Sequence, residues 1–224
     1  MPRAAYPVGT DVIVFVQSTS VVTANLFNTI SQLQFNNAAI EALTKFKNES
    51  GREFLAPAAT TRLFDPPWTN PRGFLDLRDD VINVTSVTIN GSPQTFNQDY
   101  FLWPPNADVM GKPWNGIELQ RNFPNFYLPN QRKSVAVTGQ WAYSTLIPDD
   151  VFSAIVKLAA LSLVPFLSLN ISGGLQASKT PNSEYQFGQG VENRPVVREA
   201  KMWELSALTT LKDYTRRAVG LGIG

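Results

Sequence analysis

Hydrophobic spacing along this chain changes twice, from a helical period to an alternating one and back. Residues 21–48 place apolar side chains three or four positions apart, as one face of a helix requires. Residues 56–141 instead alternate apolar and polar side chains in short runs, which is typical of half-buried strands. Helical spacing returns at Val151. We therefore predict an α+β chain in which a β-rich block separates two helical regions.

The most regular strand pattern is the last one, SVAVTGQWAYS at Ser134–Ser144. Val135, Val137 and Trp141 fall on one face of an extended strand, and we assign them to the core of the β block. Gly139 lies on the same face, where a missing side chain permits a bend or the close approach of another segment. This strand is predicted to lead the chain out of the β block into the following helix.

Five other short strands are predicted in the same block. They are Thr61–Phe64, Phe74–Leu77, Val84–Ile89, Tyr100–Trp103 and Gly116–Gln120. Asn90-Gly91 directly after the third of them favours a two-residue hairpin turn. The joints between strands are proline-rich and too short for crossover helices, so antiparallel pairing in a small sandwich or barrel is expected.

The helical regions carry recognisable start and stop signals. Ser20 or Thr23 is a candidate cap for the helical stretch over 21–48. Gln34–Asn37 is a candidate turn between two helices in that stretch, and Gly51 is a stop signal. After the β block, Pro148-Asp149-Asp150 favours the start of a long apolar helix over Val151–Ile171. A last helix is predicted over Pro195–Ala218.

These patterns divide the chain into four regions. We predict an N-terminal arm at 1–20, a helical region at 21–55, an inserted β domain at 56–146 and a helical region at 147–224. The last region includes a long Gly-, Ser- and Asn-rich loop at 172–193, before the C-terminal helix. Both the arm and the loop are segments that would order on assembly.

The segment Val151–Ile171 has the length of a membrane span. However, it contains Lys157, Pro165, Asn170 and three serines, which favour a helix buried among protein neighbours. The VIVFV run near the N-terminus is too short for the core of a signal peptide. We expect no membrane association.

Composition excludes much of enzyme chemistry. The 224 residues include neither cysteine nor histidine, which removes disulfides, thiol nucleophiles, Ser-His-Asp triads and His- or Cys-ligated metals. Carboxylate, Lys, Tyr or Ser-Lys chemistry and oxygen-ligated Mg²⁺ or Ca²⁺ remain. Nineteen Lys and Arg nearly cancel 18 Asp and Glu, so no overall charge attracts nucleic acid. We expect no enzyme activity, no catalytic residue, no cofactor and no metal site.

The acidic residues offer two kinds of candidate. Asp79-Asp80 and Asp149-Asp150 are sequence neighbours whose side chains diverge, and we interpret them as a turn before a strand and a helix N-terminus. Glu118 and Asp108 are the possible pair of a glycosidase. In that alternative Trp103 and Trp114 would be sugar platforms, although aromatic side chains commonly cap a small β core instead.

The C-terminal helix holds the candidate interface residues. One stripe of it comprises Val197, Ala200, Glu204, Leu208, Leu211 and Tyr214. Trp203 lies beside this stripe and is either a core residue or an interface anchor. Arg216-Arg217 with Lys212 either contact phosphate or complement the helix dipole.

The motifs occur in an order that resembles the head-tail connector, or adaptor, proteins of tailed bacteriophages. The resemblance covers about residues 20–165, with a weaker match in the last helix. Before and within the β block it rests on TKFKNESGREF (Thr44–Phe54), TTRLFDPP (Thr60–Pro67), FLDLRDDVINVTSVTING (Phe74–Gly91) and DYFLWP (Asp99–Pro104). GIEL (Gly116–Leu119), SVAVTGQWAYS and IPDDVFSAIVKLAAL (Ile147–Leu161) complete it.

The resemblance implies a helical bundle that carries an inserted antiparallel β domain. It also implies a homo-oligomeric ring, commonly of twelve subunits, between the portal and the tail or neck proteins of the virion. Double-stranded DNA would pass through its lumen without sequence-specific binding, and before assembly the subunit would be in the host cytoplasm. The C-terminal region is a common portal-docking element in this family. The candidate portal or ring interface is therefore Trp203, Leu208, Leu211, Tyr214, Arg216 and Arg217.

The resemblance leaves open which surface faces the portal, because this chain has a long β block and a long loop. Two alternative functions remain for the β block alone. One is a carbohydrate-binding module using Trp68, Trp103 or Trp114, and the other is a cell-wall hydrolase using Glu118.

Overall fold

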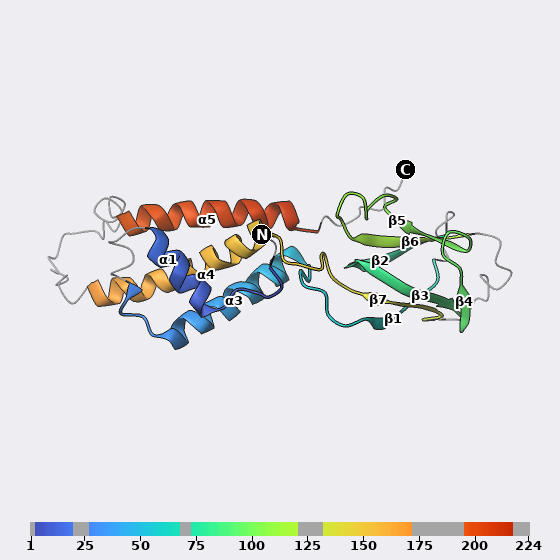
Figure 1. The fold of residues 1–224 in the computed structure, drawn as a ribbon, viewed down its shortest axis with the longest axis horizontal. Helices are drawn as coiled ribbons and strands as arrows, with labels where there is room; N and C mark the ends of the chain where they lie inside the picture. The colour runs from blue at the N-terminus through green and yellow to red at the C-terminus, as the bar shows by residue number, and fades with distance from the viewer. Residues whose placement is uncertain (1–2, 20–26, 68–72, 121–131, 172–194, 217–224) are drawn as a thin grey trace, which may run out of the picture. The chain divides into compact units, whose positions relative to one another are not determined.

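The computed structural model describes residues 3–19, 27–67, 73–120, 132–171 and 195–216 (Figure 1). Over these residues the chain is α+β, with four helices and two antiparallel sheets, which confirms the predicted class and strand pairing. It divides into two compact units. The helical unit comprises Arg3–Gly51 and Pro148–Gly224, and the β unit comprises Arg52–Ile147. The sequence pattern placed the β-rich block at 56–146.

The helical unit is organised around α4. Its described helices are α1 (Gly9–Thr19), α3 (Gln32–Ser50), α4 (Asp149–Ile171) and α5 (Pro195–Tyr214). The other three all contact α4, and its buried residues include Val151, Ile155 and Leu163. A helix that is apolar on most sides is stable only when neighbours cover most sides, which explains this central place. Among the described residues no helix is long and apolar enough to cross a membrane.

Helix α1 corrects the prediction of an arm over residues 1–20. Val12 and Val16, one turn apart, are buried, and α1 packs against α3 and α4. The VIVFV run is apolar at every position, so it shows no helical period in the sequence. Burial against neighbouring helices, rather than local spacing, selects the helix here.

The boundaries of α3 follow from its caps. Ser31 Oγ accepts a hydrogen bond from the Gln34 N–H at 3.4 Å, and Gln34 Oε1 accepts one from the Ser31 N–H at 2.9 Å. This capping box places Gln34–Asn37 in the first turns of the helix, so the turn predicted there is wrong. Gly51 ends the helix as predicted, with a left-handed φ of 66°. The proposed caps Ser20 and Thr23 lie outside the described residues.

The next boundaries are the start of α4 and the end of α5. The Pro148 carbonyl accepts a hydrogen bond from the Phe152 N–H at 2.9 Å, and Asp149 and Asp150 occupy the first turn, as predicted. Helix α5 ends at Tyr214, before the predicted Ala218. Beyond it, the Arg216 N–H donates to the Ser50 carbonyl at 3.0 Å.

The β unit contains two sheets with the orders β1-β7-β3-β4 and β2-β6-β5. The first has β1 (Thr60–Phe64), β3 (Asn83–Ile89), β4 (Ser92–Gln94) and β7 (Val135–Gln140). The second has β2 (Phe74–Val81), β5 (Tyr100–Trp103) and β6 (Trp114–Leu119). Six of these strands were predicted. Strand β4 was missed, because three residues including Pro93 carry no alternating pattern.

The predicted turn at Asn90-Gly91 is confirmed. Both residues have positive φ, 52° and 80°, and they join β3 to β4. Two successive left-handed residues are what a two-residue hairpin of this twist requires.

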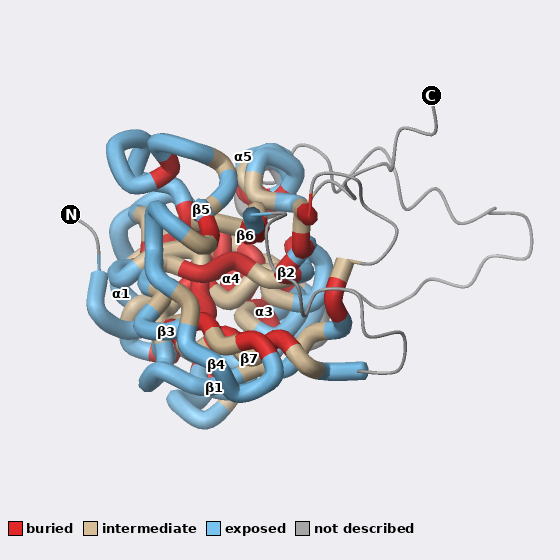
Figure 2. The backbone as a smooth tube through the Cα atoms, turned by 90° about the vertical axis from the view of Figure 1, so that its right-hand side faces the viewer, coloured by how far each residue is buried: buried red, intermediate tan, exposed pale blue. Residues whose placement is uncertain are grey.

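One core joins the two sheets. It draws Leu75 and Leu77 from β2, Ile117 and Leu119 from β6, and Val87 from β3. Along β7 the buried positions alternate with half-buried ones (Figure 2). Val135, Val137 and Trp141 are all buried, so the predicted core assignment of these three residues is confirmed.

Candidate functional site

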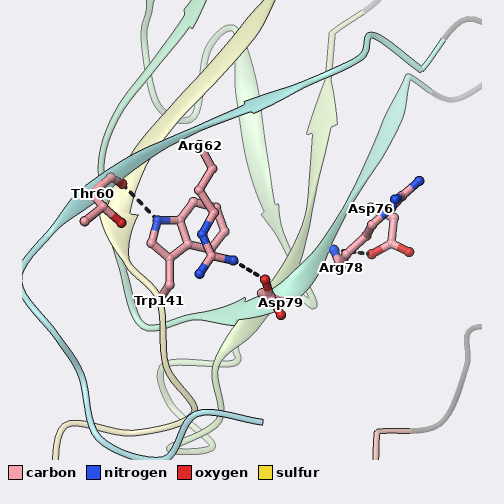
Figure 3. A network of polar contacts seen from close by, with 6 residues as sticks. All are labelled: Thr60, Arg62, Asp76, Arg78, Asp79 and Trp141. Carbon is pink, nitrogen blue, oxygen red and sulfur yellow. Dashed lines mark hydrogen bonds and ion pairs between the residues drawn. The ribbon is translucent and has the colours of Figure 1, made fainter. Parts of the chain in front are cut away.

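Trp141 directly follows β7 and contacts residues of β1 (Figure 3). Its indole lies 5.8 Å from the Phe64 ring, and its Nε1–H donates to the Thr60 carbonyl at 2.9 Å. The Arg62 guanidinium lies 4.3 Å from the indole centre and also pairs with Asp79. Because Arg62 is in β1 and Asp79 is in β2, this contact links the two sheets. Trp141 therefore has a structural role.

A second arginine, Arg52, likewise pairs with an aspartate, Asp80, and lies over an aromatic ring. Arg52 donates to Asp80 at 2.6 Å, and its guanidinium lies 5.0 Å from the Tyr143 ring. Asp80 is 7% exposed and is one of two buried polar residues found in the described part of the chain. The Tyr143 N–H donates to the Glu53 carbonyl at 2.7 Å, and the Phe54 ring packs on Tyr143.

Asp79-Asp80 is thus not a turn, and that interpretation is corrected. Both residues lie in β2, where the pairing with β6 shifts between Asp76 and Val81. Asp79 pairs with Arg62 and Asp80 with Arg52, so the two carboxylates do not converge on one site. Within the described residues no three acidic side chains gather into a group that could hold a metal ion.

The outer face of the β2-β6-β5 sheet carries an aromatic patch, which we define as Phe74, Phe101 and Trp103. Phe101 lies opposite Glu118, and Glu118 lies opposite Phe74 on the next strand. The rings of Phe74 and Trp103 meet edge to face, 6.4 Å apart. A side chain at Gly116 would overlap the Phe74 ring, so that glycine allows the ring to lie across the strand.

The two carboxylates of the possible glycosidase pair belong to different elements of the fold. Glu118 is in β6, whereas Asp108 is exposed in the turn between β5 and β6. Trp114 is half-buried against the core, and Trp103 is 46% exposed. Of these two tryptophans, only Trp103 is available to a ligand. Trp68 lies outside the described residues.

Two of the six predicted interface residues face the inside of the helical unit. Trp203 and Leu211 are buried, and the Trp203 ring meets Phe15 of α1 edge to face at 5.2 Å. Trp203 is therefore a core residue, one of the two possibilities left open by the sequence. Tyr214 donates from its hydroxyl to Asp150 Oδ1 at 3.1 Å.

The remaining members of that set are less enclosed. Arg216 is half-buried, Leu208 is 36% exposed, and Arg217 lies outside the described residues. The buried face of α5 is formed by Ala200, Trp203, Ala207 and Leu211. It is thus rotated from the predicted stripe, leaving Glu204 and Leu208 at the exposed side.

The helical unit has two further apolar surfaces, in which Leu208 is the one residue that was predicted at an interface. The first, the α5 ridge, comprises the exposed residues Lys201, Met202, Leu205, Leu208 and Lys212. Met202 is 63% exposed and Leu205 is 67% exposed. Lys201, Leu205, Leu208 and Lys212 are spaced by four, three and four residues, so they form one line along the helix.

The second surface, the α1–α4 cleft, has a volume of about 420 Å³. It is lined by Arg3, Asp11, Val14, Phe15, Asp149, Phe152, Ser153 and Val156. The Arg3 guanidinium lies 3.9 Å from the centre of the Phe152 ring and pairs with Asp11 at 3.5 Å. The cleft therefore has an apolar floor and a rim with two carboxylates and one guanidinium. Its residues escaped prediction because they come from two segments, residues 3–15 and 149–156, that are far apart in the sequence.

No family model matches this chain, and no curated protein matches it at a significant level.

Proposed function

We propose that this chain is a non-catalytic head-to-tail adaptor of a tailed bacteriophage, a ring-forming subunit between portal and tail. The observation that carries the proposal is the organisation of the chain. One helical unit is built from two segments of the sequence, and five of the seven motifs that resemble connector proteins lie in the continuous β stretch between them. In finer terms we propose a helical bundle that carries an inserted β-sandwich, with α5 as the long C-terminal helix.

The net charge of the whole chain and an exposed surface of the helical unit support this role. A formal net charge of +1 suits a conduit for DNA, because a strongly basic lumen would retain the passing duplex. The α5 ridge adds an exposed apolar surface next to the C-terminal segment, and such surfaces commonly mark protein contacts. The proposed partners are the portal protein, the following neck or tail protein and further copies of this chain, with a twelvefold ring as the expected form. Its proposed place is the virion neck.

Purified protein tests the proposal, alone and mixed with the portal protein of the same phage. We expect light scattering to report a ring-sized mass, and negative-stain images to show a ring attached beneath the portal. A stable monomer that does not bind the portal at micromolar concentrations would contradict the proposal.

The aromatic patch favours a second candidate function, a carbohydrate-binding β module. Trp103 and Phe101 present exposed rings beside the Glu118 carboxylate, a combination that stacks on sugar rings and accepts hydrogen bonds from their hydroxyls. A glycan array tests it, with Trp103→Ala as the loss variant and Leu63→Ala, an exposed residue of β1, as the matched control. Binding that is absent in the wild type, or equal in both variants, would exclude this function.

A further inference from the structure

The helical unit displays two surfaces that differ in shape. The α5 ridge runs over twelve residues, from Lys201 to Lys212, and projects along about 16 Å of helix. The α1–α4 cleft is concave, and none of its lining residues comes from α5. The two surfaces are therefore distinct and separately exposed on one subunit.

Single exposed apolar residues are common on any protein surface and need no explanation. The α5 ridge differs because its three apolar side chains lie within two turns of one helix. By comparison, the exposed Leu33 and Ile40 of α3 are two turns apart, with the polar Asn36 and Asn37 between them.

The chemistry of the two surfaces is complementary. Met202, Leu205 and Leu208 match the apolar lining of the cleft, in which Phe152 and Val156 are buried and Val14 is exposed. Lys212 lies at one end of the ridge, and the cleft rim holds the carboxylates of Asp149 and of Asp11, which also pairs with Arg3. Glu204, which borders the ridge one turn before Leu208, is opposite in charge to Arg3 on the rim.

We infer that the α5 ridge of one subunit docks into the α1–α4 cleft of a second copy of this chain. This inference rests on the proposed ring and names the contact that would build it. A contact between two different surfaces leaves one ridge and one cleft free on every dimer, so subunits add in one direction until a ring closes. A contact of a surface with itself would stop at the dimer.

Cross-linking tests the contact directly, because the chain contains no cysteine to interfere. Leu205→Cys marks the ridge and Val14→Cys marks the cleft. Both side chains are about two-thirds exposed, 67% and 65%, so the substitutions leave the fold intact, as thermal melts will verify. The two single-cysteine proteins are mixed and treated with a short thiol-to-thiol cross-linker, then separated under denaturing conditions. Leu33→Cys, which is also 67% exposed, replaces either partner as the matched control.

We expect a covalent dimer in the mixture of Leu205→Cys with Val14→Cys, at roughly ten times the yield of any mixture that contains Leu33→Cys. Leu205→Glu introduced into the Val14→Cys partner leaves that dimer intact, since only the cleft of this partner is used. Dimers formed equally by Leu205→Cys alone would show a ridge-to-ridge contact and overturn the inference. Absence of the dimer would also overturn the inference. This result is expected if another segment of the same chain covers the ridge.

Imaging of the wild-type protein distinguishes failure of the ridge-to-cleft contact from failure of the adaptor proposal. Rings without the ridge-to-cleft cross-link would remove this contact and keep the adaptor proposal. Absence of both rings and portal binding would remove the adaptor proposal as well.

Discussion

Trp141 combines burial in the core with several specific contacts. It is 2% exposed, it packs on Phe64, it stacks with Arg62 and it donates a hydrogen bond to the Thr60 carbonyl. Its burial was predictable from strand alternation. Its polar contacts were not, because Thr60 and Arg62 precede it by about eighty residues and meet it only through the pairing of β1 with β7.

Replacing Trp141 by alanine should destabilise the chain by about 3–5 kcal/mol, through a cavity and a lost hydrogen bond. Urea denaturation followed by circular dichroism measures this loss. Trp103→Ala is the matched control, since its exposed side chain should change stability by less than about 1 kcal/mol. Equal losses in both variants would contradict the role assigned to Trp141.

The two Arg–Asp pairs should differ in their effect on stability, although their chemistry is the same. Asp80 and Arg52 have side chains 6% and 18% exposed, so Asp80→Ala leaves a buried cation and should cost about 3–5 kcal/mol. Asp79 and Arg62 are 49% and 39% exposed, and Asp79→Ala should cost at most about 1 kcal/mol. Parallel urea titrations compare them. A larger loss for Asp79→Ala would show that burial does not decide the difference.

Burial raises the pKa of the Tyr100 phenol above its ordinary value of about 10. The folded chain therefore holds this proton at a pH where the unfolded chain has lost it. The resulting stability is fully present below about pH 10 and is lost as pH rises through the folded-state pKa. Tyr100→Phe should make the fall in stability above pH 10 shallower than in the wild type, as urea titrations at several alkaline pH values would show. Identical slopes would contradict this assignment.

Among the helices and strands, local sequence signals determined the helix ends and the hairpin turn, whereas tertiary packing determined which faces are buried. Gly51, Asn90-Gly91 and the Asp149-Asp150 pair acted as their sequence context predicted. The start of α3 was missed, because the capping box of Ser31 and Gln34 lies just before the turn that was predicted at Gln34–Asn37. A cap is stronger than a loose hydrophobic period when the two disagree.

Strand β7 depends on Gly139 for its pairing with β3. A Cβ at this position would overlap the Asn83 carbonyl oxygen, at the place where an extra residue of β3 lies between Val84 and Ser86. Gly139→Ala should therefore cost about 1–3 kcal/mol by forcing the two strands apart. Gly91→Ala is the comparison variant, where no atom lies within 4 Å and only the positive φ of 80° opposes the methyl group. A Gly139→Ala variant as stable as the wild type would show that β3 can shift at little cost.

For the whole molecule, the structure separates residues that hold the fold from residues free to assemble. Trp203 and Leu211, predicted at an interface, are buried in the helical unit, whereas Leu205 and Met202 are exposed beside them. Leu205→Glu should consequently keep the wild-type melting temperature and lower the yield of rings, measured by light scattering. Leu33→Glu on α3 is the control and should keep both. Loss of thermal stability in Leu205→Glu would place this residue with the core instead.

The sequence by itself determined the α+β class, six of the seven described strands, the hairpin at Asn90-Gly91 and the core role of Val135, Val137 and Trp141. These features depend on periodicity and turn chemistry, which act over a few residues. Tertiary structure alone decided that α1 is a helix, that Asp79 and Asp80 bind separate arginines, and that Trp203 faces inward. It also decided which surfaces of the helical unit stay exposed. Each of these depends on residues far apart in the chain, whose proximity is set by packing and not by spacing.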